Sequence, residues 1–284
     1  MSEKREPKHF IESLSRGIKI LECFGAERPY LSLQDLSHLA GLNKTAVQRL
    51  TDTLMKLGLI GRNDHKEFFL EPRILTLGYA YLKGSELRRL GETHVKDFGK
   101  RIGRTVNLAV LDGRDVLFLF RHEVKTFFKF NLQEGSRLPA HCTSLGKVLL
   151  AALNHNDLEQ QIRKMKFEAL TSYTITDPKA FQKEIALTHS RGYGVSNQEG
   201  TLGLFSVAAP LINHEGRAVA AVNMSLTIEE AENERFPKLV EELLSECERW
   251  SMLLGYEGLY PWPGASLDTR PLPFGKKKGQ TRAS

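Results

Sequence analysis

Near its beginning the chain alternates hydrophobic and polar positions at the spacing of short α-helices. Apolar side chains recur every three or four residues in residues 10–24, 33–40 and 44–57, which predicts three helices with one buried face each. Ser32 and Asn43 stand directly before the second and third stretches, where their side chains can cap free N–H groups. The pattern therefore predicts a compact helical unit.

A change of pattern follows the third stretch. Residues 59–62 and 67–70 are two short β-strand candidates, and the polar residues 63–66 between them are typical of a hairpin tip. Helical spacing then returns in residues 73–84, which we interpret as a linker helix.

Beyond the linker the sequence mixes β-rich apolar runs with amphipathic helices. An Asp-Gly turn at residues 112–113 predicts a hairpin. Together these elements predict an α+β domain around an antiparallel sheet, over residues 85–256. The expected strands are 105–111, 116–120, 126–131, 193–195, 206–211 and 218–226, and the expected helices are 85–101, 144–153, 157–165, 178–191 and 229–254.

The expected domain organisation has four parts. Residues 1–72 form the first domain, 73–84 the linker helix and 85–256 the second domain. Residues 257–284 are rich in proline, glycine and lysine, so we expect a disordered basic tail.

Composition and charge narrow the class of protein. Hydrophobic residues make up 41% of the 284 and charged residues 26%, as in folded globular proteins. No apolar run is long enough to cross a membrane and no signal peptide is evident, so we expect a soluble cytoplasmic protein without a membrane partner. Three widely spaced cysteines disfavour disulfides and a zinc site. The net charge of +6 is concentrated at the two ends, which suits a polyanionic partner.

Residues 33–52 meet the steric demands of a helix-turn-helix. Gly41 supplies the tight turn, and Ser37 is the small residue where the two helices touch. Apolar side chains occupy the packing positions, which are Leu36, Ala40, Leu42, Val47 and Leu50. An ordinary helical hairpin would not require the β-hairpin that follows, so we interpret the unit as a winged helix that binds DNA.

The predicted DNA contacts lie on the second helix of the motif and on the wing. Gln48 and Arg49 are the expected base readers, because their side chains face outward and can address base edges. Lys44, Arg62 and Lys66 are the expected phosphate contacts, and Thr45 can serve either role. With the two capping residues, the full predicted set is Ser32, Asn43, Lys44, Thr45, Gln48, Arg49, Arg62 and Lys66.

Several stretches resemble the IclR-type bacterial transcription regulators. The resemblance lies in SLSRGIKILECF, in the helix-turn-helix and LEPRILTLGYAYL, and most of all in GSRLPAHCTSLGKVLLA and GYGVSNQEGTLGLFSVAAPL. It covers roughly residues 11–255 and is closest to the branch that regulates protocatechuate and 4-hydroxybenzoate catabolism. The resemblance implies a C-terminal GAF-like effector-binding domain, a small organic acid as effector, and a homodimer or tetramer on palindromic operator DNA. RNA polymerase is a further expected partner if the protein is an activator.

Residues 137–146 and two later strands contain the candidate effector pocket. The expected helix at Ser144 offers N–H groups and a hydroxyl to an anion, and Asn223 and Ser225 alternate along one strand so that both face one side. Arg137 and His141 are further candidates to pair with a carboxylate or phenol. The resemblance implies that Ser144, Leu145 and Gly146 approach the ligand and that Ser206, Asn223 and Ser225 line its pocket.

Two alternatives stay open beside the aromatic-acid regulator, and an enzyme is a third class to consider. The effector can be another small organic acid, such as glyoxylate, pyruvate or a sugar acid. Cys142, close to a helix N-terminus, could have a lowered pKa and serve as a redox sensor. An enzyme is disfavoured because the sequence has no nucleophile-elbow, zinc-protease or Walker motif, and we expect no catalytic residue, cofactor or metal.

Overall fold

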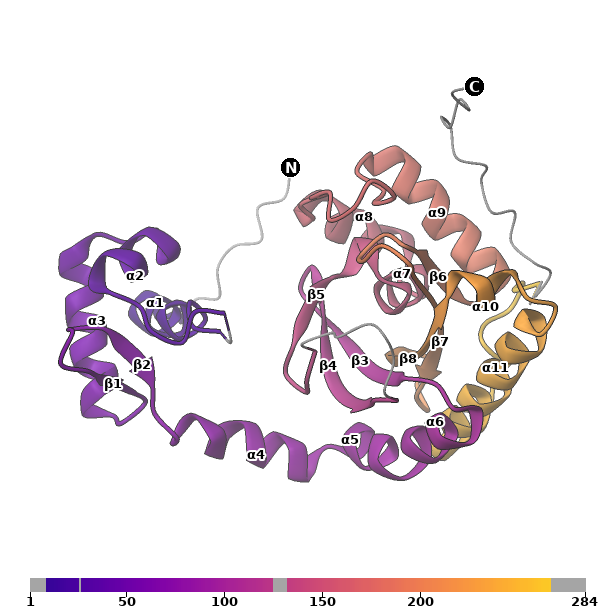
Figure 1. The fold of residues 1–284 in the computed structure, drawn as a ribbon, viewed down its shortest axis with the longest axis horizontal. Coiled ribbons are helices and arrows are strands. Elements are labelled where there is room, and N and C mark those ends of the chain that lie inside the picture. The colour runs from indigo at the N-terminus through magenta and orange to yellow at the C-terminus, as the bar shows by residue number, and fades with distance from the viewer. Residues whose placement is uncertain (1–8, 26, 125–131, 267–284) are drawn as a thin grey trace, which may run out of the picture. The chain divides into compact units, whose positions relative to one another are not determined.

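The computed structural model describes residues 9–25, 27–124 and 132–266, which divide into two compact units, Met1–Ser85 and Glu86–Ser284 (Figure 1). The strand expected at 126–131 and the lysines at 276–278 lie outside the described residues. No helix within the described ranges is long and apolar enough to span a membrane.

The N-terminal unit is a winged helix, as predicted. Its elements are α1 (Glu12–Leu21), α2 (Leu33–Ala40), α3 (Lys44–Lys56), β1 (Ile60–Arg62), β2 (Phe68–Leu70) and α4 (Ile74–Gly84). Ser32 and Asp35 form a capping box at the start of α2, and the Asn43 side chain accepts the Ala46 N–H at the start of α3. Between these helices Gly41 has a φ of +64°, a left-handed conformation that glycine adopts without strain.

The helix-turn-helix packs around a small apolar core. Leu36, Ala40 and Val47 are fully buried beside Ile20 of α1 and Phe68 of the wing. The Ser37 hydroxyl donates to the Leu42 carbonyl oxygen at 2.6 Å, so it occupies the space where the helices approach and satisfies a turn carbonyl. Strands β1 and β2 pair in antiparallel register from Ile60–Leu70 to Arg62–Phe68, which closes the wing.

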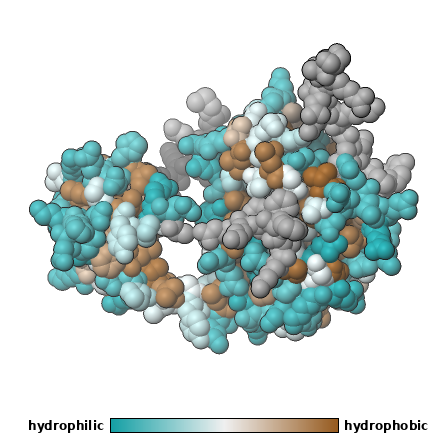
Figure 2. Space-filling view, viewed as in Figure 1, coloured by the Kyte–Doolittle hydropathy of each residue, from teal (hydrophilic) through white to brown (hydrophobic). Residues whose placement is uncertain are grey.

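Two helices of this unit leave apolar side chains in solvent. None of the residues of α4 is buried, and its exposed apolar side chains are Leu75, Leu77, Tyr79 and Tyr81. Phe10 and, on α1, Ile11 at the cap, Leu14 and Ile18 are likewise exposed. Hydrophobic surface is visible among the hydrophilic residues of this unit (Figure 2). Apolar patches of this kind mark interfaces in soluble proteins.

Within the described residues, the C-terminal unit is built on a six-stranded antiparallel sheet in the order β5-β4-β3-β8-β7-β6. The strands are β3 (Val106–Asp112), β4 (Asp115–His122), β5 (Arg137–Pro139), β6 (Gly194–Asn197), β7 (Leu204–Ile212) and β8 (Ala218–Thr227). Apolar residues, chiefly Val, Leu, Ala and Phe, make up most of the four long strands, which favours a buried sheet.

Helices cover both faces of the sheet (Figure 1). On one face, Leu108, Val207 and Val222 pack against a first group of helices, at the start and end of the unit. On the other face, Ala109, Ala208 and Ala221 pack against a second group, in the middle of the unit. The first group comprises α5 (Glu86–Leu90), a π-helical turn (Gly91–Val95), α6 (Lys96–Ile102), α10 (Ile228–Glu232) and α11 (Phe236–Leu253). The second comprises α7 (Ser144–Ala151), α8 (His155–Lys164) and α9 (Pro178–Arg191). This mixed helix-and-sheet layout is the α+β, GAF-like order expected from the sequence.

The single helix expected over 229–254 is instead two helices. The chain leaves helical conformation at Asn233, and α11 starts anew at Phe236 with Pro237 in its first turn. Proline has no N–H and its ring excludes the preceding turn, so it fits a helix start and interrupts a helix interior.

The expectation of a disordered tail from residue 257 does not hold for residues 257–266. The Tyr260 hydroxyl donates to the Pro210 carbonyl oxygen at 2.9 Å, and the Trp262 ring stacks on His189 with centroids 5.1 Å apart. The Trp262 indole N–H also donates to the His189 carbonyl oxygen. Proline and glycine content predicted disorder here, whereas the aromatic rings dock this segment on α9 and β7.

Candidate functional site

The N-terminal unit presents polar side chains along α3. Lys44, Thr45 and Arg49 are exposed, whereas Gln48 is partly covered and donates to Asp52 Oδ1 at 2.7 Å. Ser32 and Asn43 engage their side chains in capping α2 and α3. Of the two expected base readers, Arg49 is therefore the exposed one, and Gln48 must leave Asp52 before it can bind elsewhere.

The wing carries the remaining cations of the predicted set. Lys66, at the tip, has a φ of +63°, and its carbonyl oxygen accepts from Arg62 Nε at 3.4 Å. The Arg62 guanidinium lies over the Phe68 ring, 5.2 Å from its centroid. Both side chains are exposed, so the wing offers two positive charges to solvent.

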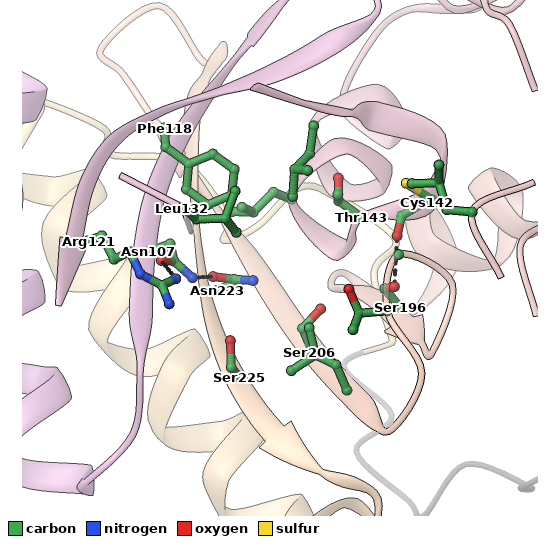
Figure 3. A pocket seen from close by; sticks show the side chains of 16 residues that line it. Asn107, Phe118, Arg121, Leu132, Cys142, Thr143, Ser196, Ser206, Asn223 and Ser225 are labelled. Carbon is green, nitrogen blue, oxygen red and sulfur yellow. Dashed lines mark hydrogen bonds between the residues drawn. The ribbon is translucent and has the colours of Figure 1, made fainter. Parts of the chain in front are cut away.

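The C-terminal unit contains a cavity of about 300 Å³ on the sheet face that α7 covers. Its walls are mostly apolar, and its floor is a polar patch on β3, β4, β7 and β8 (Figure 3). The lining residues are Asn107, Phe118, Arg121, Leu132, Leu138, Cys142, Thr143, Leu145, Leu170, Ser196, Gly200, Thr201, Leu204, Ser206, Asn223 and Ser225. Four residues predicted from the sequence are among them: Leu145, Ser206, Asn223 and Ser225.

Cross-strand register arranges the polar floor in two rows. In the first, Arg121 pairs with Asn107 and Asn107 pairs with Asn223 across β4, β3 and β8. In the second, Ser225, Ser206 and Ser196 are partners across β8, β7 and β6. Side chains of directly opposed residues on one face lie close together, so each row forms a continuous polar strip.

Arg121 reaches the cavity because of a β-bulge. The β3–β4 register pairs Asn107 with Arg121 but Ala109 with Phe118, so β4 holds one extra residue between the two pairs. Strict alternation would place Phe118 and Arg121 on opposite faces, whereas both line the cavity. Periodicity in the sequence therefore hides Arg121, and only the paired register reveals it.

Among the described residues that line the cavity, Arg121 is the cation. Its side chain is 8% exposed; Nη1 donates to Asn107 Oδ1 at 2.8 Å, and Nη2 donates to Glu123 at 3.0 Å. Its buried Nε has no partner among the described residues. A buried charged donor left partly unsatisfied carries a cost in folding stability.

Of the three residues at the start of α7, only Leu145 lines the cavity. The Ser144 hydroxyl is fully buried and bonds the Ser206 hydroxyl at 2.9 Å, so it supports a floor residue. The Gly146 N–H donates to the Thr143 hydroxyl. A Cβ on Gly146 would lie 2.2 Å from the Ala140 carbonyl oxygen, and one on Gly194 would lie 2.2 Å from that of Ser144. Because glycine has no Cβ, the backbone at Gly146 can approach that of Ala140, and the backbone at Gly194 can approach that of Ser144.

Arg137 and His141 lie outside the cavity lining. The exposed Arg137 is paired with Asp112 at 2.5 Å and Asp115 at 3.5 Å. His141 is buried, its Nε2 lies 3.1 Å from the Glu168 carbonyl oxygen, and its ring packs edge-on against Phe167. Burial lowers the pKa of His141, which keeps the imidazole neutral with Nε2 donating. Both residues thus have partners within the fold.

Cys142 lines the cavity as a protonated thiol. Burial, with the Glu199 charge nearby, raises its pKa to about 12, the opposite of the lowering expected from the helix start. The residue belongs to the 3-10 turn Ala140–Cys142, before α7 begins. A thiol of such a pKa is a poor nucleophile and reacts slowly with oxidants.

These two units define a class of protein. A winged helix-turn-helix that exposes Arg49 on its second helix is built to bind DNA, and a domain with an apolar-walled cavity over a polar floor is built to bind a small molecule. The combination is that of a transcriptional regulator with an effector-binding domain.

Comparison with known proteins gives the family. Residues 13–64 match the IclR helix-turn-helix domain, and residues 79–252 match the C-terminal domain of bacterial IclR transcriptional regulators. The chain therefore belongs to the IclR family, as the sequence motifs indicated.

The comparisons also give individual relatives. The chain is 33% identical to the Pca regulon regulatory protein of Pseudomonas putida, over 76% of this chain and 74% of that one. It is 31% identical to the p-hydroxybenzoate hydroxylase transcriptional activator of Acinetobacter baylyi, over 78% and 83%. An IclR homologue from Microbacterium hydrocarbonoxydans, solved with 4-hydroxybenzoate, superposes with a TM-score of 0.69 at 25% identity, over 86% and 99%.

Proposed function

We propose that this protein regulates a catabolic operon for an aromatic hydroxy acid, such as protocatechuate or 4-hydroxybenzoate, by binding that acid in the cavity. The cavity carries the proposal. At about 300 Å³ it is at the small end of the range for ligand sites, roughly 300–1,000 Å³, which suits a single ring. Phe118 and several leucines offer apolar walls to the faces of a ring, and the floor offers donors to its substituents.

The relatives support this choice over other acids. One is a Pca regulon regulatory protein, one is a p-hydroxybenzoate hydroxylase transcriptional activator, and one was solved with 4-hydroxybenzoate. Glyoxylate, pyruvate and sugar acids lack an apolar face to place against Phe118, Leu145 and Leu204. The raised pKa of Cys142 argues against the redox-sensing alternative.

The proposed effector contacts are Leu145, Ser206, Asn223 and Ser225, with Ser144 holding Ser206 in place. The proposal assigns binding rather than turnover to this cavity. Operator DNA is the proposed partner of α3 and the wing, through Lys44, Thr45, Gln48, Arg49, Arg62 and Lys66. The exposed apolar faces of α1 and α4 favour a homodimer or a tetramer of such dimers.

Isothermal titration of the full chain with 4-hydroxybenzoate and protocatechuate tests the proposal. We expect binding of at least one acid, and release or tightening of operator DNA by the same acid in a mobility-shift assay. Ser225→Ala removes one hydroxyl and should weaken binding roughly tenfold to a hundredfold, because an unpaired ligand oxygen costs about 1–3 kcal/mol. Operator affinity without ligand should not change. Absence of binding with both acids, or consumption of either, would refute the proposal.

A further inference from the structure

The first polar row on the cavity floor has a fixed direction. Arg121 can only donate hydrogen bonds, so Asn107 must turn its oxygen towards Nη1, as the 2.8 Å contact shows. Asn107 then presents its Nδ2 to the next strand, where it donates to Asn223 Oδ1 at 2.8 Å. One arginine thus fixes the orientation of two side-chain amides, whose oxygen and nitrogen atoms would otherwise be interchangeable.

The end of this row lies in the cavity. Since the Asn223 oxygen accepts from Asn107, its nitrogen points away from Asn107 into the space between the lining side chains (Figure 3). Asn223 is 7% exposed, and its Nδ2 has no acceptor among the described residues. The cavity therefore contains an oriented N–H donor that is available to a ligand acceptor.

We propose that the Arg121–Asn107–Asn223 row determines the ligand specificity of the cavity, and that it selects an effector carboxylate over a neutral group such as the corresponding primary amide. This inference rests on the proposal that the cavity holds the effector, and goes further by assigning the recognised group. Arg121 brings a positive charge to the row, which the half-exposed Glu123 at 3.0 Å offsets in part, and Asn223 supplies the oriented N–H. Arg121 and Asn107 are positioning residues, and Asn223 contacts the ligand.

Burial explains why the row should discriminate. A hydrogen bond between an ionised acceptor and a buried donor is about twice as strong as a neutral one. A primary amide, turned so that its NH₂ meets Asn223, would leave two donors facing each other. The second row consists of the hydroxyls of Ser196, Ser206 and Ser225. Ser196 donates to the Cys142 carbonyl oxygen at 2.8 Å and Ser206 bonds Ser144, and because the row carries no charge it does not select by charge. We expect it to take the ring hydroxyl of a hydroxybenzoate.

Matched ligand pairs test the inference on the wild-type chain. Each carboxylate is compared with its own primary amide by thermal shift and calorimetry: 4-hydroxybenzoate, benzoate, pyruvate and succinate, each at neutral pH. We expect the carboxylate of any pair that binds to bind at least tenfold more tightly than the amide. Equal affinities within a pair would overturn the inference.

Asn107→Asp is the decisive variant, because it keeps the side-chain shape and reverses the row. Aspartate accepts from Arg121 and cannot donate to Asn223, so the Asn223 amide turns to donate to residue 107 and presents its oxygen to the cavity. We expect carboxylate affinity to fall roughly tenfold to a hundredfold and the preference to shift towards the amide. A merely structural role for Asn107 would weaken both ligands of a pair equally, and that result would overturn the inference.

Two further variants complete the test. Arg121→Gln removes the charge and should weaken the carboxylate far more than the amide. Arg217→Gln removes an exposed arginine on the β7–β8 turn, outside the cavity, and should change neither affinity. If only aliphatic carboxylates bind and Arg121→Gln weakens them, the aromatic proposal fails while the inference stands. If no carboxylate of the panel binds the wild type, both fail.

Discussion

Lys147 of α7 is buried, and its replacement by methionine tests how much its ion pairs contribute to the free energy of unfolding. Its side chain is 1% exposed, and its Nζ lies 2.5 Å from Glu199 and 3.5 Å from Glu184. Glu184 also pairs with Arg191 at 2.9 Å. Lys147→Met therefore leaves Glu184 with a partner and leaves Glu199 without its cation.

The cost follows from what remains of Glu199. Its side chain is 7% exposed, and its Oε2 has no partner among the described residues. Removing one member of a buried ion pair typically costs about 3–5 kcal/mol, because the other charge is left uncompensated. We expect a loss of this size in the free energy of unfolding. The variant Lys147→Met with Glu199→Leu removes both charges and should recover all but about 1 kcal/mol.

Denaturant unfolding followed by tryptophan fluorescence is a suitable assay. Trp250 and Trp262, the two tryptophans of the chain, both lie in the C-terminal unit, so the signal reports the domain that carries the substitution. Trp250 is buried against Phe98 and should report loss of packing. A single-variant cost below about 1 kcal/mol, or a double variant as unstable as the single one, would refute the reasoning.

The cost of Lys147→Met should also depend on pH. Burial raises the pKa of Glu199 above its ordinary 4.5, and Lys147 opposes that rise. Without Lys147 the pKa rises further, so above pH 4.5 the folded variant holds a proton that the unfolded chain has lost. Stability of the variant then falls as the pH increases through this window. We expect a larger cost at pH 8 than at pH 5, and equal costs would contradict this account.

Three other predictions concern DNA binding, acid stability and assembly. Arg49→Ala should cost about 1–3 kcal/mol of operator affinity and relax the sequence preference. Lys66→Ala should weaken binding to all sequences alike and reduce the slope of log affinity against log salt concentration by about one. Fluorescence anisotropy with operator and scrambled duplexes separates the two effects, and identical losses on both duplexes for both variants would contradict these roles. The lowered pKa of buried His141 means that the folded chain binds fewer protons than the unfolded chain below pH 6.5. Stability should therefore fall between pH 6.5 and 5, and His141→Gln should lose less over that range in the same denaturation assay; parallel losses in both proteins would argue against it. Leu77→Glu, on the exposed face of α4, should shift the dimer towards monomer in light scattering. A wild-type chain that is already monomeric at micromolar concentration would contradict the proposed interface.

Local features were predictable from the sequence. The helix-turn-helix depends on Gly41 and on apolar spacing within one short segment, and Pro178 marks the observed start of α9. Ser206, Asn223 and Ser225 were found because a polar residue on an apolar strand is conspicuous in a single run of sequence.

Features that depend on pairing between distant segments were not predictable. Arg121 faces the cavity only because β4 has a bulge, and Asn107 meets it only because β3 is the neighbouring strand. Neither fact can be derived from the spacing of residues within one strand. The docking of Tyr260 and Trp262 was missed for a related reason, since the composition around them is typical of disorder while their partners lie 50 and 73 residues away.

The close contacts at Gly146 and Gly194 restrict how this domain can acquire a new ligand preference. Any side chain at either position would collide with backbone atoms, which cannot move without displacing α7 or β6. Substitutions at these two positions would destabilise the folded domain before they altered its ligand preference. Divergence of ligand choice, in nature or in a directed-evolution library, is therefore confined to the floor rows and to apolar wall residues such as Phe118, Leu132 and Leu170. A library intended to retarget the protein as a biosensor should vary those positions and leave both glycines untouched.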